Sequence, residues 1–489
     1  MASVSSYPSP SYALPSASQI GPRDAILVML PFQLDTSNKN TVQKCYTHLR
    51  DAFVRVQQLF PFLGSQLRQD AKGIVIMTAA PDNEKTYFKL RNDEYTKSIS
   101  YEHLEKAEFS PSCIEWTQLS IDNHSLIGGG AVPIAGAELV VIDGGLLFFP
   151  FIHHCAGDGA HMARFLETFS AATRNKLEPT SIPPLLISAT SQHKTQIEAG
   201  SEGTKKFFQL LRQCPEYCYN ADCKTPCDFT MREPAHPIAN KHSEIFAIPK
   251  ANIQQLKNEL GTDARLSTFI FLAALCWSHV ADARKTETYQ DNTHPPPGAK
   301  HSAEVSNNTA RMIMPVDWAK RVSPQPESFG YYVVFAVASV DYNVLLTASN
   351  PTLSHDERKS ALAKVIDAIK KAIAAVDEAY VLKRMDLIKH ASDPRLLGLN
   401  FDTRSKKDMI FNTWQWMSGD AQWNVGAKSI KPILRKTNIP SPGSGLILPA
   451  QRDAKELEIQ INLPGDSMNN FKKDALFSGF LKDGTNLRD

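Results

Sequence analysis

Two strongly apolar runs on either side of a glycine pair are the sequence feature that most restricts the fold. The runs are VPIAGAELVVID, residues 132–143, and LLFFPFI, residues 146–152. Apolar runs of this length that meet at turn residues are typical of buried strands, so they predict a β-hairpin. The hairpin delivers the chain to PFIHHCAGDGA, residues 150–160, where two neighbouring histidines precede an expected helix.

Helical periodicity marks the segments around the hairpin. Met162, Phe165, Leu166 and Phe169 recur at helical spacing, and Asp158 stands where an N-cap residue accepts hydrogen bonds from the first turn. Other helices are expected at 41–60, 250–260 and 267–284, and a long helical stretch, interrupted or not, is expected at 354–390. Other strands are expected at 26–34, 243–248, 310–318, 331–340, 408–417 and 457–463. Strands and helices mixed along both halves favour an α/β fold with mixed sheets.

The chain is long enough for two domains. Its 489 residues are 42% hydrophobic, and a single core stops growing at roughly 250–300 residues. We expect an N-terminal domain at 1–182, a crossover linker at 183–240 and a C-terminal domain at 241–489. The linker is rich in proline and polar residues, which is typical of a connection between domains.

Charge and hydropathy exclude several classes of protein. The 53 basic and 51 acidic residues nearly balance at +2, and the chain lacks both the basic stripe of a nucleic-acid-binding protein and a polybasic membrane anchor. The Ser/Pro-rich start has no signal-peptide pattern, and the apolar runs are shorter than the roughly 20 residues of a membrane span. We therefore expect a soluble cytoplasmic protein with no membrane or nucleic-acid partner.

Four of the eight cysteines lie in the linker: Cys214, Cys218, Cys223 and Cys227. Four thiols can bind zinc tetrahedrally, but the C-x3-C-x4-C-x3-C spacing is unusual for a zinc site. Disulfides need an oxidising compartment, which the N-terminus does not indicate. Free thiols in a connecting segment are the favoured interpretation, with a structural metal and disulfides as the alternatives.

The histidine pair His153-His154 is the strongest candidate for chemistry. Successive residues of a strand point to opposite faces, so only one of the two imidazoles can face a given pocket. This divergence disfavours a metal held by His153, His154 and Asp158, and two packed structural histidines are the alternative to a site. The sequence also lacks the G-x-S-x-G elbow, the P-loop and the G-x-G-x-x-G fingerprint. What remains is acid/base chemistry by one imidazole, whose ordinary pKa of about 6.5 allows proton uptake at neutral pH.

The motif around the pair resembles that of the BAHD acyltransferases. HCAGD, residues 154–158, matches their H-x-x-x-D signature, and HHCAGDG, residues 153–159, fits the H-H-x-x-x-D-G form shared with condensation domains of peptide synthetases. Further matches in the family's order are PFLGSQL, LSTFIFLAALCWSHVADAR, MPVDWAKRVSPQPESFG and IFNTWQW, so the resemblance covers about residues 24–475. The chain looks most like the fungal branch, near trichothecene 3-O-acetyltransferases and related secondary-metabolite acyltransferases.

The resemblance implies two domains of chloramphenicol-acetyltransferase-like fold with a solvent channel between them. Acyl-CoA is then expected to enter from one face and the acceptor from the other, with His154 as the general base in mid-channel. The resemblance gives Asp158 a structural, orienting role, because the family's aspartate points away from the channel and pairs with an arginine.

Four further residues are assigned to the site by the same resemblance. Trp414 and Asn412 are implied to lie near the tetrahedral oxyanion, where an N–H group can donate to the developing charge. Ser267 and Thr268 are implied to approach the pantetheine arm of the cofactor, and they also offer an N-cap for the expected helix.

Two landmarks depart from the family pattern. The second signature, D-F-G-W-G, is QWNVG here at residues 422–426, and the usual F-G-N is FGY at residues 329–331. Asp420 is a candidate substitute for the missing aspartate, which in the family is a structural partner of an arginine far from the base. The departures concern the channel wall and the CoA side, so His154 is intact while the donor and the reaction stay open.

We therefore expect a monomeric, acyl-CoA-dependent acyltransferase that O-acetylates a hydroxyl, or less favourably amidates an amine, of a fungal secondary metabolite. Both substrates bind together, with acetyl-CoA as co-substrate and no metal, and no covalent acyl-enzyme forms. Two alternatives stay open. One is a condensation-like enzyme that uses a carrier-protein thioester, and the other is a protein derived from the family that binds or cyclises a metabolite without acyl transfer.

Overall fold

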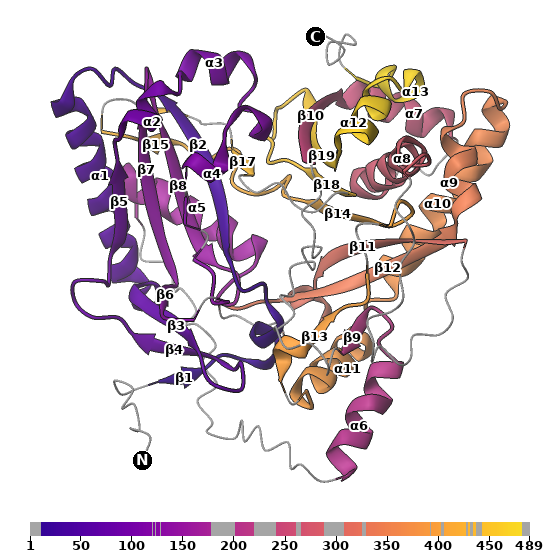
Figure 1. Ribbon diagram of the computed structural model, residues 1–489, viewed down its shortest axis with the longest axis horizontal. Coiled ribbons are helices and arrows are strands. Elements are labelled where there is room, and N and C mark those ends of the chain that lie inside the picture. The colour runs from indigo at the N-terminus through magenta and orange to yellow at the C-terminus, as the bar shows by residue number, and fades with distance from the viewer. Residues whose placement is uncertain are drawn as a thin grey trace.

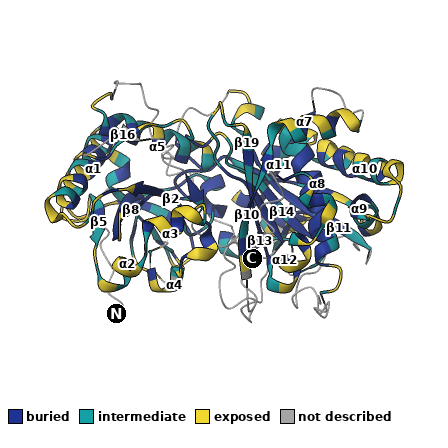
Figure 2. Cartoon of the chain, turned by 90° about the horizontal axis from the view of Figure 1, so that it is seen from above, coloured by how far each residue is buried: buried dark blue, intermediate teal, exposed yellow. Residues whose placement is uncertain are grey.

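The computed structural model describes most of the chain. The described residues are 11–119, 121, 122, 124–127, 129–177, 201–219, 241–260, 266–287, 308–324, 329–391, 393–401, 405–426, 429, 430, 434–436 and 443–481. They form two halves that lie side by side, each built around its own large β-sheet (Figure 1). Figure 2 shows that buried residues follow the strands of both halves, whereas exposed residues lie on the outer helices.

The N-terminal half contains a five-stranded sheet in the order β17-β2-β8-β7-β5. Its strands are β2 (Ala25–Gln33), β5 (Tyr87–Arg91), β7 (Ala135–Ile142), β8 (Gly145–His153) and β17 (Arg435–Lys436). β7 and β8 pair antiparallel around Gly144, whose φ of +73° suits a residue without a side chain. The predicted hairpin is therefore confirmed.

Helices cover both faces of this sheet. α1 (Lys39–Leu59) and α5 (Gly159–Thr173) share one core with one face of the strands, and the predicted stripe of α5 is buried in it. The opposite face packs against α2 (Glu94–Ser98), α3 (Tyr101–Lys106) and α4 (Trp116–Leu119). A smaller sheet, ordered β1-β4-β3-β6, lies at one end of this half; its strands are β1 (Tyr12–Ala13), β3 (Ser65–Gln69), β4 (Val75–Ala79) and β6 (Val132–Pro133).

The C-terminal half contains a six-stranded mixed sheet in the order β10-β19-β18-β14-β11-β12. Its strands are β10 (Lys241–Pro249), β11 (Thr309–Asp317), β12 (Val333–Asp341), β14 (Met409–Thr413), β18 (Ser444–Ile447) and β19 (Glu456–Pro464). β14 runs parallel to both of its neighbours and the other pairs are antiparallel, which confirms the expectation of mixed sheets.

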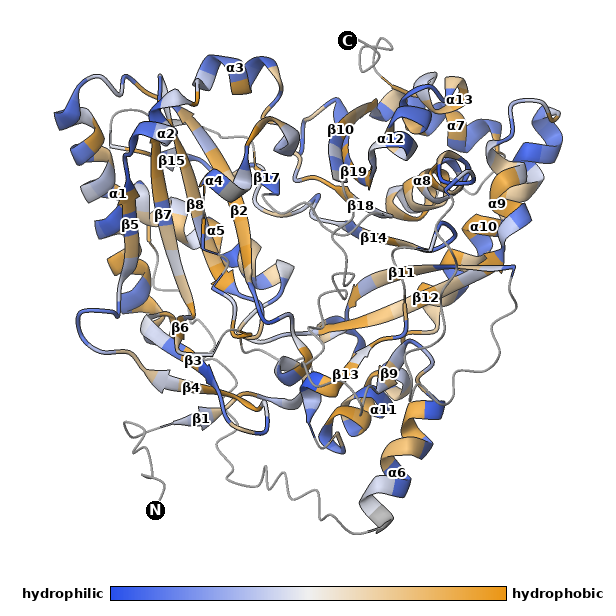
Figure 3. Cartoon of the chain, in the orientation of Figure 1, coloured by the Kyte–Doolittle hydropathy of each residue, from blue (hydrophilic) through white to orange (hydrophobic). Residues whose placement is uncertain are grey.

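α8 (Thr268–Ala283) is the central helix of this half. It is apolar on most of its surface (Figure 3) and packs into the core between the sheet and its neighbouring helices. Those helices are α7 (Lys250–Glu259), α9 (Tyr342–Ser349), α10 (His355–Ala374), α12 (Gly465–Lys472) and α13 (Ala475–Ser478). Among the described helices, none is long and apolar enough to cross a membrane.

The expected helical stretch at 354–390 is interrupted and forms two helices in the structure. α10 ends at Ala374 and α11 (Glu378–Lys389) begins after Asp377, whose side chain accepts a hydrogen bond from the backbone N–H of Tyr380. α11 packs against α6 (Ser201–Arg212), and the paired strands β9 (Tyr217–Tyr219) and β13 (Leu397–Leu399) belong to the same cluster. Short 3-10 turns lie at Ser16–Ile20, Pro61–Gly64, Pro111–Cys113, Ala319–Arg321 and Pro394–Leu396.

A segment of the expected C-terminal domain, 241–489, packs into the N-terminal half: it contributes β17 and the buried residues Trp423 and Leu434. β17 pairs antiparallel with β2 and becomes the edge of the N-terminal sheet (Figure 1). Trp423 and Leu434 are buried in the core formed by α1 and α5, and β15 (Trp423–Asn424) pairs with β16 (Ser429–Ile430). The buried guanidinium of Arg435 binds Glu458 of β19 and the carbonyl of Glu108, so it links the two halves.

Candidate active site

The two motif histidines have different surroundings. His153 is the last residue of β8 and is fully buried on the face that α2, α3 and α4 cover, opposite Ala25 of β2. Its Nδ1 accepts a hydrogen bond of 3.2 Å from the N–H of Cys155, so the proton lies on Nε2, which donates 3.1 Å to the carbonyl of Arg23. His153 is thus a packed structural histidine.

His154 follows β8 and is only partly buried. Its N–H donates to the carbonyl of Asp24, and its ring meets the ring of Tyr331 edge to face with centroids 5.6 Å apart. Nδ1 is buried and makes no hydrogen bond to any described residue. Burial, together with the positive charge of Lys436, lowers the pKa of His154 to about 4, although Asp158 acts in the opposite direction. The imidazole is therefore neutral at physiological pH and able to accept a proton.

Asp158 is the N-cap residue of α5, as predicted. Its Oδ1 accepts hydrogen bonds from the N–H groups of Ala160 at 3.0 Å and His161 at 3.2 Å. The same oxygen lies 2.8 Å from Nδ1 of His161. The family pattern implied an arginine as the partner of this aspartate, whereas among the described residues the ionisable partner is His161.

The second oxygen of Asp158 reaches the other half of the molecule. Oδ2 accepts a hydrogen bond of 2.9 Å from the N–H of Tyr332, one residue before β12. Burial alone would raise the pKa of Asp158, but the hydrogen bonds from His161 and Tyr332 outweigh it and hold the pKa below its usual value. Phe329 packs on the ring of His161 at 4.6 Å, so the segment that departs from the family pattern lies directly against the motif.

Trp414 lies beside the N-terminal end of α5, whereas Asn412 has no described contact with the motif. β14 ends at Thr413, and the N–H of Trp414 donates to the carbonyl of Ile447 at 2.8 Å. A Cβ atom placed on Gly159 would lie 3.9 Å from the indole Nε1 of Trp414, so the indole lies beside the first residue of the helix. Asn412 lies on β14 and accepts a hydrogen bond from the N–H of Thr413.

Lys436 is a further candidate site residue that the sequence reasoning missed. Its ammonium lies 4.6 Å from the centroid of the Trp414 ring, and burial lowers its pKa to about 8. Its charge also depresses the pKa of His154. The residue is on a strand of two residues, which has no periodicity that a sequence pattern could reveal. Tyr331 was noted only as a departure from the family pattern.

Ser267 and Thr268 lie at the start of α8, as expected, but neither contacts the motif through a described hydrogen bond. Ser267 is at the N-cap position and its side chain forms no capping hydrogen bond. The hydroxyl of Thr268 accepts a hydrogen bond of 3.0 Å from the ammonium of Lys257. Their role towards pantetheine stays a prediction.

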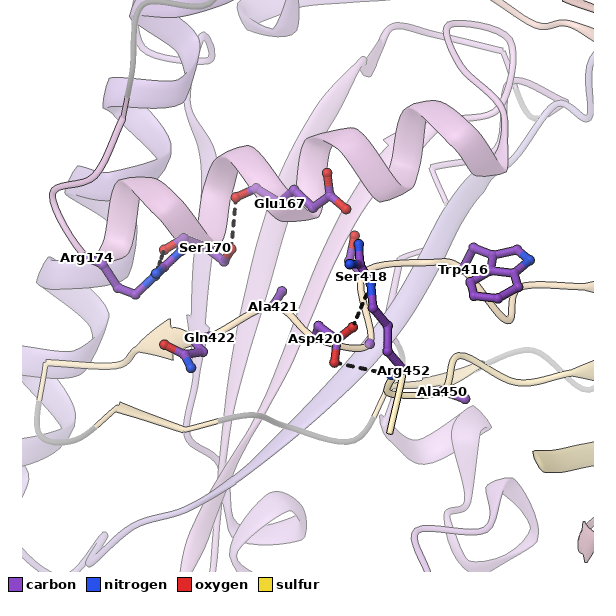
Figure 4. A pocket seen from close by; sticks show the side chains of 11 residues that line it. Glu167, Ser170, Arg174, Trp416, Ser418, Asp420, Ala421, Gln422, Ala450 and Arg452 are labelled. Atoms are coloured by element: carbon purple, nitrogen blue, oxygen red, sulfur yellow. Dashed lines mark hydrogen bonds and ion pairs between the residues drawn. The ribbon is translucent and has the colours of Figure 1, made fainter. Parts of the chain in front are cut away.

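The altered second signature is a packed segment. Trp423 is fully buried against Phe148 and Phe169. Asp420, the candidate substitute for the family's aspartate, lies 3.5 Å from the guanidinium of Arg452, and this pair is at the surface. Asp420 and Arg452 line a polar cavity of about 380 Å³ along α5 (Figure 4). His154 does not line this cavity. The lining residues are Glu167, Ser170, Arg174, Trp416, Ser418, Gly419, Asp420, Ala421, Gln422, Ala450 and Arg452.

The cysteine and metal expectations are tested only in part. Cys214 is a free, buried thiol, and the thiol of Cys218 donates a hydrogen bond of 3.5 Å to the carbonyl of Leu399, whereas Cys223 and Cys227 lie outside the described residues. Within the described ranges, no group of three or more His, Cys, Asp or Glu residues could hold a metal ion.

Known proteins with similar sequences are acyltransferases. Trichothecene 8-O-acetyltransferase of Fusarium sporotrichioides is 22% identical over 377 residues, which cover 72% of each chain. Anthranilate N-benzoyltransferase protein 2 of Dianthus caryophyllus is 23% identical over 242 residues, which cover 48% of this chain and only 47%, about half, of that relative. No model of a known family matches the chain.

The fold agrees with a solved structure over almost the whole chain. F. sporotrichioides TRI101 complexed with coenzyme A and T-2 has a TM-score of 0.65 at 16% identity, and the match covers 97% of this chain and 99% of that one. TRI101 has the two-domain BAHD fold, so the predicted fold class is confirmed. In sequence and in fold, this chain is similar to BAHD acyltransferases, the family that its motifs resemble.

Proposed function

We propose that the chain is an acyl-CoA-dependent acyltransferase that esterifies a hydroxyl of a secondary metabolite of fungal type, with acetyl-CoA as donor and His154 as general base. The observation that carries the proposal is the partly buried, neutral imidazole of His154 at the end of β8. Its acid/base chemistry fits acyl transfer, and the relatives with assigned names transfer acyl groups.

In the proposed mechanism both substrates bind together. The neutral imidazole of His154 takes the proton of the acceptor hydroxyl as its oxygen attacks the thioester carbonyl carbon. The electron pair of the C=O bond moves to oxygen and gives a tetrahedral oxyanion. When the C=O bond re-forms, the C–S bond breaks, and the imidazolium of His154 protonates the leaving CoA thiolate. His154 ends the cycle neutral, and no metal or covalent acyl-enzyme takes part.

The remaining site residues have supporting roles in this proposal. Asp158 holds the turn that carries His154, because it caps α5 and fastens the turn to Tyr332. The indole N–H of Trp414 and the amide of Asn412 are proposed donors to the oxyanion. Ser267 and Thr268 are proposed to contact pantetheine at the start of α8. We propose a monomeric cytoplasmic enzyme whose partners are acyl-CoA and a small alcohol or amine.

A substrate screen tests the proposal. The protein is incubated with acetyl-CoA and longer acyl-CoAs and a panel of alcohols that includes T-2, and products are identified by mass spectrometry as acceptors that have gained one acyl group. The matched control is His154→Ala at the same concentration and with the same melting temperature. Acylated product from wild type alone is expected. Equal product from both proteins would contradict the assignment of the base.

The donor preference separates the two alternatives. If CoA binds the native state, the melting temperature rises with its concentration, with about 2.7 kcal/mol of stabilisation expected at 100 times the dissociation constant. Stabilisation by a metabolite but by no CoA thioester would favour the binding or cyclising alternative. Product from a carrier-protein thioester only would favour the condensation-like enzyme.

A further inference from the structure

Lys436 lies on the same face of the N-terminal sheet as His154. It pairs across the sheet with Val28, which belongs to the core beneath α1 and α5. His153 pairs with Ala25, whose side chain lies on the opposite face, so the following residue, His154, turns to the α5 face. The register of β17, β2 and β8 therefore brings a lysine and the motif histidine to one side of the sheet.

Among the residues that the structure describes, the ammonium of Lys436 has no counter-ion. It lies over the ring of Trp414, with 4.6 Å between Nζ and the ring centroid, and no described carboxylate lies within ion-pair distance of it. The preceding residue contrasts with it, since the guanidinium of Arg435 forms hydrogen bonds of 2.8 and 2.9 Å with both oxygens of Glu458. Shielding a cation from water without a paired anion costs free energy, so the arrangement suits a negative charge that is present only during part of the reaction.

Trp414 connects this cation to the motif. Its ring holds Lys436 on one side, while its indole nitrogen lies beside Gly159 at the start of α5. His154 is five positions before Gly159 in the motif turn. The positive charge of Lys436 acts on His154, because it lowers the pKa of the imidazole. A negative oxygen that forms next to His154 would therefore form within the field of the Lys436 ammonium.

We propose that Lys436 is a catalytic residue whose ammonium, held over Trp414, stabilises the oxyanion formed when the acceptor attacks the thioester. This inference rests on the function proposed above. The ammonium stays protonated throughout: the acceptor proton goes to His154, the carbonyl electron pair goes to the oxygen beside Lys436, and both return when the thiolate leaves. Burial lowers the pKa of Lys436 only to about 8, so the side chain is mostly charged at neutral pH.

The test compares Lys436→Met, which keeps the length of the side chain without its charge, with Lys436→Arg, which keeps the charge. Turnover is followed as CoA thiol released from acetyl-CoA, with the alcohol that gives the highest wild-type rate in the screen. Lys436→Met is expected to lower kcat by roughly 100-fold, as expected when one oxyanion donor is removed. KM for acetyl-CoA should change by less than about 3-fold, because the charge acts in the transition state. Lys436→Arg should recover at least about a tenth of the wild-type kcat.

Lys89 provides a matched control. Its ammonium also lies over an aromatic ring, 4.5 Å from the centroid of Tyr87, but Lys89 is exposed and lies on β5, the opposite edge strand of the same sheet. Lys89→Met should keep the wild-type kcat. Should Lys436→Met fail to fold, Lys436→Gln with a wild-type melting temperature takes its place.

The remaining outcomes overturn the inference in different ways. If Lys436→Met has the same kcat as wild type, the charge of Lys436 does not stabilise the oxyanion, and the proposed function would stand. An increase in the KM of the acceptor with unchanged kcat would mean that Lys436 binds an anionic group of that substrate in the ground state. A wild-type protein that neither binds CoA by calorimetry nor releases thiol would overturn the proposed function and this inference together.

Discussion

Replacement of Asp158 tests whether the motif aspartate is an interdomain fastener as well as a helix cap. Its Oδ1 serves the first turn of α5 and the ring of His161, and its Oδ2 serves Tyr332 in the other half. Asparagine has only one acceptor oxygen. In Asp158→Asn the amide NH₂ group must therefore face either the N–H of Tyr332 or the N–H groups of the helix, and one set of donors loses its partner.

The expected magnitudes follow from these contacts. In Asp158→Ala the lost cap costs about 1 kcal/mol, the buried N–H of Tyr332 about 1–3 kcal/mol, and the hydrogen bond to His161 a similar amount. Because such terms are not additive, we expect a total of about 3–5 kcal/mol. In Asp158→Asn the remaining oxygen should stay on the side with three donors, the helix cap and His161, and the link to Tyr332 is lost, so about 1–3 kcal/mol is expected. Both variants should also lower turnover, since the turn that carries His154 loosens.

A second helix cap supplies the control. Asp377 caps α11 through one hydrogen bond to the N–H of Tyr380, at an exposed position, so Asp377→Ala should cost only about 1 kcal/mol. Urea unfolding followed by far-ultraviolet circular dichroism and by tryptophan fluorescence would measure the changes in free energy of unfolding. If Asp158→Ala destabilises the protein no more than Asp377→Ala does, the contact with Tyr332 carries no free energy and the reasoning is wrong.

Three further perturbations test the motif. His154→Ala should lower kcat by at least roughly 100-fold without a change in melting temperature, and wild-type turnover would refute the mechanism. Tyr331→Ala should admit water to His154 and move the acid limb of the pH profile of kcat/KM upwards from about 4, whereas Tyr331→Phe should not. Burial lowers the pKa of His153 from 6.5 to about 3, so the unfolded state takes up the proton first as the pH falls. The contribution of neutral His153 to the free energy of unfolding should be fully present above pH 6.5 and should fall by roughly 5 kcal/mol towards pH 3. Thermal melts between pH 7 and 4 that show no loss of stability would contradict this.

The parts of the site that depend on local chemistry could be predicted from the sequence. The hairpin of β7 and β8 follows from two apolar runs and a glycine turn, and the cap at Asp158 follows from its place before a helical stripe. The different environments of His153 and His154 follow from strand geometry, which needs no knowledge of the rest of the chain.

The parts that depend on distant segments could not be predicted. Lys436 reaches the site because β17 pairs with β2, which is hundreds of positions earlier, and two residues carry no periodic signal. The substitution of His161 for an arginine as the partner of Asp158 depends on which side chains meet at the first turn of α5. Ser267 has the sequence signature of a cap, and its side chain makes no capping hydrogen bond.

The electrostatics of His154 contain an apparent conflict that the reaction itself resolves. A base with a pKa of about 4 is weak, and the burial and the Lys436 charge that cause this low value are built into the fold. This pKa applies to the protein without substrates. As the acceptor oxygen attacks, negative charge grows on the thioester oxygen, and it offsets the repulsion between Lys436 and a protonated His154. The basicity of His154 therefore rises during the step that requires it. When the oxyanion collapses, the repulsion returns, and the imidazolium becomes a stronger acid as the CoA thiolate needs its proton.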